Sequence, residues 1–305
     1  MTPAETGRTW TASSHGVDWR LELERDRLLP GRLVAVRISV AARRRVDARG
    51  LILLLRGEEH WRYEVTTTDH EGRTRTETRT GRDELPRVPV AVSGPLTLTA
   101  GETRTFDVEL PVPGLGPATL DAETAGVAWG LEAKLDVGSG RDPAIDVPVA
   151  IAQPLALLRA GVVRVGQFAL FDAADAAHGD ISGEIALDPA PLVCGEPFTG
   201  RLVLRSPSPT RVQEVRAELR VMVEATVAGG LQETVVPWSG QVAGPGEITG
   251  EVAFDIAGTI EDRLLPTIDL PHGRASSEFH LILARAWARD PHLVRGVVLA
   301  TTGEV

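Results

Sequence analysis

The chain has 305 residues, of which 43% are hydrophobic and 24% are charged. That length allows two domains that each bury a core, and that composition excludes a largely disordered chain. Acidic residues outnumber basic ones by 42 to 32, giving a net charge of −10. Because a negative chain is repelled by phosphate backbones, general nucleic-acid binding is disfavoured.

The cysteine content and the apolar segments indicate the compartment. Cys194 is the only cysteine, so no intrachain disulfide can form, which favours a reducing environment. Residues 1–20 are polar and contain no apolar signal core. The longest apolar stretches, such as residues 51–55, are too short to cross a bilayer. We therefore expect a soluble, cytoplasmic protein without membrane insertion.

Alternating apolar and polar residues dominate the first half, which predicts antiparallel strands with one buried face. A polar leader containing Ser13-Ser14-His15 comes first, and nothing in its sequence predicts a rigid structure. Residues 51–55 are apolar at every position, which favours a central strand. The expected strands lie near residues 19–24, 33–40, 50–57, 106–110 and 129–137.

The polar segment of residues 66–82 predicts an exposed β-hairpin, because threonine alternates with charged residues and His70-Glu71-Gly72 suits a tip. The hairpin is either a solvated ribbon or a contact loop, since loops often carry recognition. Its arginines are the candidate partner-contact residues: Arg73, Arg75, Arg79 and Arg82.

Residues 152–180 read as a linker, and residues 172–178 are its best helical candidate. Its acidic and histidine side chains could approach one another, and oxygen ligands suit calcium. They also suit the polar ends of an ordinary linker helix. Both interpretations concern the same four residues: Asp172, Asp175, His178 and Asp180.

The second half repeats the order of the first, with strands expected at residues 200–204, 212–223, 251–256 and 279–284. The turn at Pro30-Gly31-Arg32 recurs at Cys194-Gly195-Glu196. The step Pro117-Ala118-Thr119 recurs at Leu265-Pro266-Thr267, and proline there predicts an exposed connection between sheets. This duplication predicts an all-β chain of two tandem immunoglobulin-like antiparallel β-sandwich domains, at residues 1–155 and 156–305.

The order of elements resembles the arrestin fold family. The resemblance rests on a Pro-Gly turn before a strand, on Leu53-Leu54-Leu55-Arg56-Gly57, on a Gly-Glu turn before a strand ending in Leu110-Pro111, and on the aromatic-led strand from Trp129. It is greatest to the bacterial sporulation-control type and more distant to the retromer cargo-sorting subunit. It implies a cytoplasmic adaptor without a catalytic site. The phosphate-sensing lysines of animal arrestins have no counterpart in residues 19–24, so receptor-phosphate binding is not implied.

Motifs for chemistry are missing from the sequence. It contains no Gly-x-Ser-x-Gly elbow, no glycine-rich phosphate loop and no zinc-type spacing. Cys194 lies in a repeated turn, which favours a structural role. We expect no catalytic residue, no cofactor and no bound metal.

The remaining hypotheses concern binding. A protein-binding adaptor is favoured over a sugar- or calcium-binding module, and an enzyme is least favoured. A homodimer through unpaired sheet edges is compatible with the strand content, without pointing to a residue. Tryptophans could form stacking platforms for sugars, although Trp61 and Trp238 occupy similar positions in the two halves, which favours a structural role: Trp61, Trp129, Trp238 and Trp287.

Overall fold

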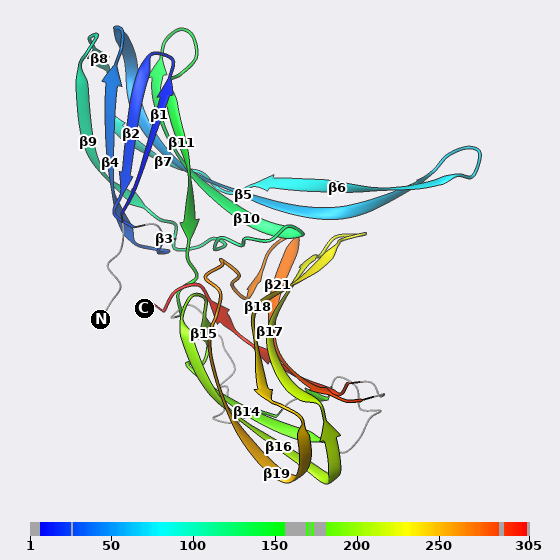
Figure 1. Cartoon of the computed structure of the whole chain (residues 1–305). Coiled ribbons are helices and arrows are strands. Elements are labelled where there is room, and N and C mark those ends of the chain that lie inside the picture. Colours follow the sequence, from blue (N-terminus) through cyan, green and yellow to red (C-terminus); the bar gives the residue numbers. More distant parts are fainter. Residues whose placement is uncertain are drawn as a thin grey trace. The chain divides into compact units, whose positions relative to one another are not determined.

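A computed structural model of the chain describes residues 7–25, 27–155, 169–170, 172–173, 181–286 and 290–303. Every element with described bounds is a strand, so the protein is all-β with several antiparallel sheets (Figure 1). The chain divides by its contacts into two compact units. Unit 1 comprises Met1–His60, Arg82–Thr119 and Val127–Ala152, and unit 2 comprises Trp61–Gly81, Leu120–Gly126 and Gln153–Val305.

The first half of the chain forms two sheets. One has the strand order β1-β2-β4-β9, and the other has the order β3-β11-β10-β5-β6, with β7 and β8 also paired to β5. The strands are β1 (Arg8–Ser14), β2 (Val17–Leu23), β3 (Arg27–Leu28), β4 (Leu33–Ala42), β5 (Val46–Thr68), β6 (Thr74–Glu84), β7 (Val88–Ser93), β8 (Leu96–Leu98), β9 (Thr103–Pro111), β10 (Ala125–Val137) and β11 (Ala144–Ile151).

The second half forms sheets of the orders β12-β14-β16-β19 and β13-β22-β21-β17-β18, with β20 paired to β21 and β15 paired to β23. The strands are β12 (Ala169–Leu170), β13 (Asp172–Ala173), β14 (Ser182–Asp188), β15 (Leu192–Val193), β16 (Pro197–Val212), β17 (Glu214–Ala225), β18 (Gln232–Ala243), β19 (Gly246–Thr259), β20 (Ile268–Asp269), β21 (Gly273–Ala284), β22 (His292–Val297) and β23 (Leu299–Ala300).

Alternation of side chains accounts for the buried faces. In β10, Leu131 and Leu135 are fully buried, whereas Lys134 between them is only half-buried. In unit 2, Phe198 of β16 lies against Trp238 of β18 with ring centroids 4.9 Å apart, so side chains of the two larger sheets meet there. The predicted central strand is confirmed as part of β5, which pairs with β8 at residues 46–48 and with β7 at residues 51–55.

The two halves of the chain share one backbone arrangement at their last strands. A two-residue strand pairs in parallel with the last strand of its half, β3 with β11 and β15 with β23. A glycine with positive φ follows each short strand: Gly31 at 73° and Gly195 at 80°. Gly31 donates its N–H to the Val112 carbonyl, and Gly195 donates to the Ile260 carbonyl, over 3.0 and 3.1 Å.

The repeated proline-threonine step is buried or half-buried at every residue, so the predicted exposed connection is wrong. The Thr119 hydroxyl accepts a 2.8 Å hydrogen bond from the Ile151 N–H, and Thr267 accepts a 2.9 Å bond from the Leu299 N–H. Each threonine N–H also donates to the carbonyl of the same residue, Ile151 or Leu299. Proline disrupts strand pairing, and the neighbouring threonine replaces the missing ladder bonds with its side chain, so the segment can be buried.

Three other predictions require correction. The polar leader is strand β1, which pairs with β2 along its whole length, and Arg43 and Ser13 both bond the Asp18 carboxylate at its end. Asp172 and Ala173 belong to β13, so no helix begins there, and residues 174–178 lie outside the described residues. Trp61 lies within β5 and Trp238 within β18, so the two do not occupy equivalent positions.

Candidate functional site

The predicted hairpin is confirmed, and its two strands are β5 and β6. Thr66 and Thr76 have hydroxyls 3.1 Å apart across the ribbon, and those of Thr68 and Thr74 are 3.4 Å apart. Both pairs are on one face, since side chains on alternate residues of a strand share a face. Beyond residue 64 of β5, most side chains of the hairpin are exposed on both faces. This outer part of the hairpin, the ribbon, therefore has no core of its own.

Asp69 organises the hairpin tip. Its carboxylate accepts hydrogen bonds from the backbone N–H groups of Glu71 and Arg73, each 2.9 Å long. Its own N–H donates to the Arg73 carbonyl, and Gly72 has a φ of 78°. The tip is therefore a built turn in which an aspartate satisfies the local backbone donors, as aspartates often do.

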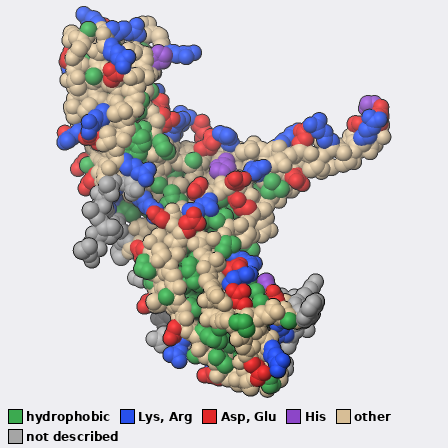
Figure 2. All heavy atoms as spheres, viewed as in Figure 1, with side chains coloured by type: hydrophobic (Ala, Val, Ile, Leu, Met, Phe, Trp, Pro, Cys, Tyr) green, Lys and Arg blue, Asp and Glu red, His purple; other side chains and the backbone are tan. Residues whose placement is uncertain are grey.

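The structure places the four candidate arginines along this ribbon, each within 4 Å of an acidic side chain. Arg73 lies 2.9 Å from Glu71, and Arg82 lies 3.0 Å from Glu58. Glu77 lies between two of them, 3.1 Å from Arg75 and 3.7 Å from Arg79. The guanidinium groups stay more than half exposed, and Figure 2 shows basic and acidic side chains interspersed along the ribbon. The ribbon therefore presents charge of both signs.

The hairpin is held in unit 2 at its base. Trp61 stacks on His272 with ring centroids 3.8 Å apart, and its indole lies across the backbone of Gly81, where a Cβ would meet it at 2.2 Å. The backbone of β5 continues this contact. Arg62 donates its N–H to the Thr124 carbonyl, and Glu64 donates to the Gly229 carbonyl, both over 2.8 Å. The base is therefore fixed while the distal ribbon is free of packing.

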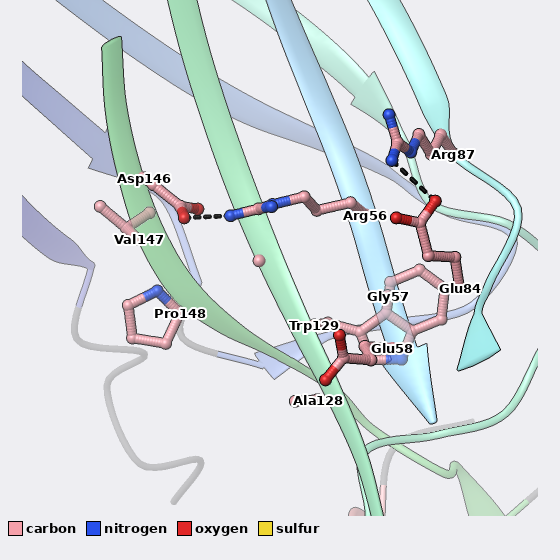
Figure 3. A pocket seen from close by; sticks show the side chains of 11 residues that line it. Arg56, Gly57, Glu58, Glu84, Arg87, Ala128, Trp129, Asp146, Val147 and Pro148 are labelled. Atoms are coloured by element: carbon pink, nitrogen blue, oxygen red, sulfur yellow. Dashed lines mark hydrogen bonds and ion pairs between the residues drawn. The ribbon is translucent and has the colours of Figure 1, made fainter. Parts of the chain in front are cut away.

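A pocket of about 390 Å³ lies in unit 1 at the other end of the hairpin strands (Figure 3). Two ion pairs flank it, one between Arg56 and Asp146 and the other between Arg87 and Glu84, the latter at 2.7 Å. Figure 3 shows Arg56 reaching across β10 toward Asp146 of β11. The lining residues are Arg56, Gly57, Glu58, Glu84, Arg87, Ala128, Trp129, Gly130, Asp146, Val147 and Pro148.

Small residues in β10 create this hollow. Gly130 lies under the ion pair, and a Cβ there would be 3.3 Å from the Asp146 carboxylate and 3.8 Å from Arg56 Nε. Trp129, which also lines the pocket, is 5% exposed, and its indole N–H donates to the Pro117 carbonyl over 3.2 Å. The pocket can accept polar and charged groups, and its floor offers backbone and an aliphatic surface.

A second group of ionisable side chains lies on β17 and β21. Glu218 is 9% exposed and pairs with Arg216 at 2.9 Å and with Arg220 at 2.6 Å. His280 lies opposite Glu218 in the strand register and holds Glu278 at 2.8 Å. Burial lowers the pKa of His280, against the opposing effect of the Glu278 carboxylate. Glu218 and its two arginines form an ion-pair cluster, and the hydrogen-bonded pair of His280 and Glu278 lies on the neighbouring strand.

No family model and no curated protein matches this sequence.

Several other residues that the sequence singles out lie outside the hairpin. In the ranges that the structure describes, no three His, Cys, Asp or Glu side chains gather to hold a metal ion, and no helix is long and apolar enough to cross a membrane. Of the proposed calcium cluster, Asp175, His178 and Asp180 lie outside the described residues, as does Trp287. Cys194 is buried beside β15, where its N–H donates to the Ala300 carbonyl.

No sequence pattern described above predicts the pocket. The signal that could have revealed it is Gly130 in an otherwise regular alternating strand, because an isolated glycine there often marks a close approach of other groups. Pairing Arg56 with Asp146 requires the strand order β11-β10-β5, which the sequence does not state.

Proposed function

We propose that the protein is a non-enzymatic, cytosolic scaffold of the arrestin-like kind that binds protein partners, similar in role to the sporulation-control type. The proposal includes two tandem immunoglobulin-like antiparallel β-sandwiches. Its support is the pair of units, each with a parallel closing pair and a glycine turn at matching places, together with the sequence resemblance. Fold analogy alone does not establish a function, so the proposal also needs a surface feature suited to binding a partner.

The observation that carries the proposal is the distal hairpin. A two-stranded ribbon without a hydrophobic face is marginally stable in water, because its contacts barely offset the entropy lost on ordering. This ribbon nevertheless has a side-chain-capped tip, cross-strand threonine pairs and an aromatic anchor at its base. An ordered, exposed ribbon of mixed charge is suited to contact with another protein.

The tryptophans give less support to a sugar-binding module. Trp129 is 5% exposed, and Trp238 stacks on Phe279 with ring centroids 5.7 Å apart. Trp61 has one ring face filled by His272. Stacking platforms for sugars need an open aromatic face, and these three indoles are used in packing.

The test replaces residues 66–76 by Asn-Gly, which closes the ribbon with a two-residue turn while keeping the Trp61 anchor. Partners are captured from the native cell with wild type and variant and quantified by mass spectrometry. We expect the shortened protein to keep its melting temperature within about 2 °C, since the removed segment has little buried surface. We expect it to lose the proteins that wild type enriches.

A charge variant tests whether partner binding depends on the hairpin arginines or only on the length of the hairpin. Changing three hairpin arginines to glutamine removes positive charge and leaves the ribbon intact: Arg73→Gln, Arg75→Gln and Arg79→Gln. The matched control makes the same change at three exposed, ion-paired arginines of unit 1, outside the hairpin: Arg20→Gln, Arg37→Gln and Arg45→Gln. If the shortened variant captures the same partners as wild type in equal amounts, the hairpin does not bind them.

A further inference from the structure

The outer edge of β6 is open along the hairpin. β6 is the last strand in its sheet order, and no strand in the described part of the chain pairs with that edge. Leu85 donates its N–H to the Gly57 carbonyl, and Arg73 accepts from Asp69, so odd-numbered residues of β6 direct their backbone groups toward β5. Even-numbered residues, Thr78 among them, therefore direct their N–H and C=O groups outward.

We propose that this edge pairs with the same edge of a second copy of the chain, antiparallel about a two-fold axis at Thr78. The inference does not depend on the proposed scaffold function. In a contact about a two-fold axis, a residue i that faces residue j of the second copy implies that residue j also faces residue i of that copy. The edge must therefore be complementary to itself. The segment Thr-Arg-Thr-Glu-Thr-Arg-Thr at residues 74–80 contains no proline or lysine, the residues that most often block strand addition to an edge.

The charges select a single register. With Thr78 opposite its own copy, Glu77 faces Arg79 of the second copy and Arg73 faces Asp83 of the second copy. Each pair occurs twice by symmetry, and each joins opposite charges. The odd-numbered residues form the pairs without backbone bonds, whose side chains are the closer ones in an antiparallel ladder.

The neighbouring registers bring like charges together. Moving the axis to Glu77 places that glutamate opposite itself and Arg75 opposite Arg79. Moving it to Arg79 places two guanidinium groups opposite each other. Because like charges directly opposite are destabilising, only the register centred on Thr78 is free of conflict among these three.

The other face of the ribbon agrees with this register. Threonines on β5 and β6 already form cross-strand pairs there, at Thr66–Thr76 and Thr68–Thr74. In the dimer, Thr76 lies opposite Thr80 of the second copy and Thr78 opposite itself, so the rows of threonines continue across the junction. Threonine pairs favour strand pairing through their β-branched packing and hydroxyl contacts.

The test uses charge reversal on the full chain, with sedimentation equilibrium over a wide concentration range. We expect wild type to show a monomer–dimer equilibrium. Glu77→Arg and Arg79→Glu each replace two attractive pairs by two repulsive ones and raise the dimer dissociation constant roughly tenfold or more. The double variant Glu77→Arg/Arg79→Glu restores opposite charges and recovers dimerisation to within about threefold of wild type.

Mixing the single variants gives the decisive result. A chain with Glu77→Arg and a chain with Arg79→Glu are complementary to each other and repel themselves, so the mixture forms heterodimers at concentrations where each alone is monomeric. Thr78→Pro removes an outward N–H without touching the bonds to β5 and abolishes dimerisation, with an unchanged circular dichroism spectrum as its folding control. Wild type that stays monomeric at every concentration, or single variants that dimerise as wild type does, would overturn the proposal.

Discussion

His280 shows how one buried side chain sets a pH dependence. It is 8% exposed, and its Nδ1 has no hydrogen-bond partner among the described groups. Protonation would place a second N–H donor in a site without an acceptor for it. Burial therefore lowers its pKa from the ordinary 6.5, although Glu278 favours the charged form and Arg220 and His292 oppose it.

The sign of the effect follows from linkage. The folded protein binds fewer protons at this site than the unfolded chain, so folding becomes less favourable as the pH falls from about 7 through the folded pKa. We expect the free energy of unfolding to drop by about 1 kcal/mol or less over that range. Urea unfolding of wild type and His280→Gln between pH 7.5 and about pH 5 measures it. The His280→Gln variant should lose this pH dependence of the free energy of unfolding. The control variant His70→Gln, at a side chain that is 91% exposed, should retain it.

At the scale of the element, β19 offers a matched pair of glycines. A Cβ at Gly258 would lie 2.0 Å from the Trp238 indole nitrogen, and Trp238 packs on Phe198 and Phe279. A Cβ at Gly246 would meet nothing within 4 Å. The indole thus covers one glycine and leaves the other open.

We therefore expect Gly258→Ala to lower the free energy of unfolding by about 1–3 kcal/mol, because it displaces an indole from a packed core. Gly246→Ala should change it by no more than about 0.5 kcal/mol. Chemical denaturation followed by tryptophan fluorescence compares them. Equal stability of the two variants would show that Trp238 can move at little cost.

Prediction from the sequence was strongest for strands that alternate strictly. Residues 131–137 and 215–223 were placed correctly because one face of each is apolar throughout. Strand β1 was missed because its residues are polar on both faces and it is ordered by pairing with β2. The pocket was missed because an ion pair that spans a middle strand depends on the order of strands, which local patterns do not contain.

At the scale of the whole molecule, the buried Thr119 and the half-buried Thr267 make equivalent hydrogen bonds in the two units. Each accepts a hydrogen bond from the last strand segment of its unit, at Ile151 and at Leu299. Valine would keep the shape and remove the acceptor. The buried N–H left behind costs about 1–3 kcal/mol.

We expect Thr119→Val and Thr267→Val each to lower stability by that amount, and the double variant to show the sum, because their bonding partners differ. Differential scanning calorimetry of the three variants tests this. Thr119→Ser and Thr267→Ser retain the acceptor and serve as controls. A double variant no less stable than either single one would contradict separate roles for the two threonines.

The base of the hairpin has a consequence for synthesis on the ribosome. Trp61 is translated 211 residues before His272, on which it stacks, and Glu64 is translated 165 residues before Gly229, to which it bonds. Until those later residues have been made, this polar ribbon lacks its anchor. Its threonine and charged residues suit that interval, since a hydrophobic edge exposed for so long would invite aggregation on the polysome.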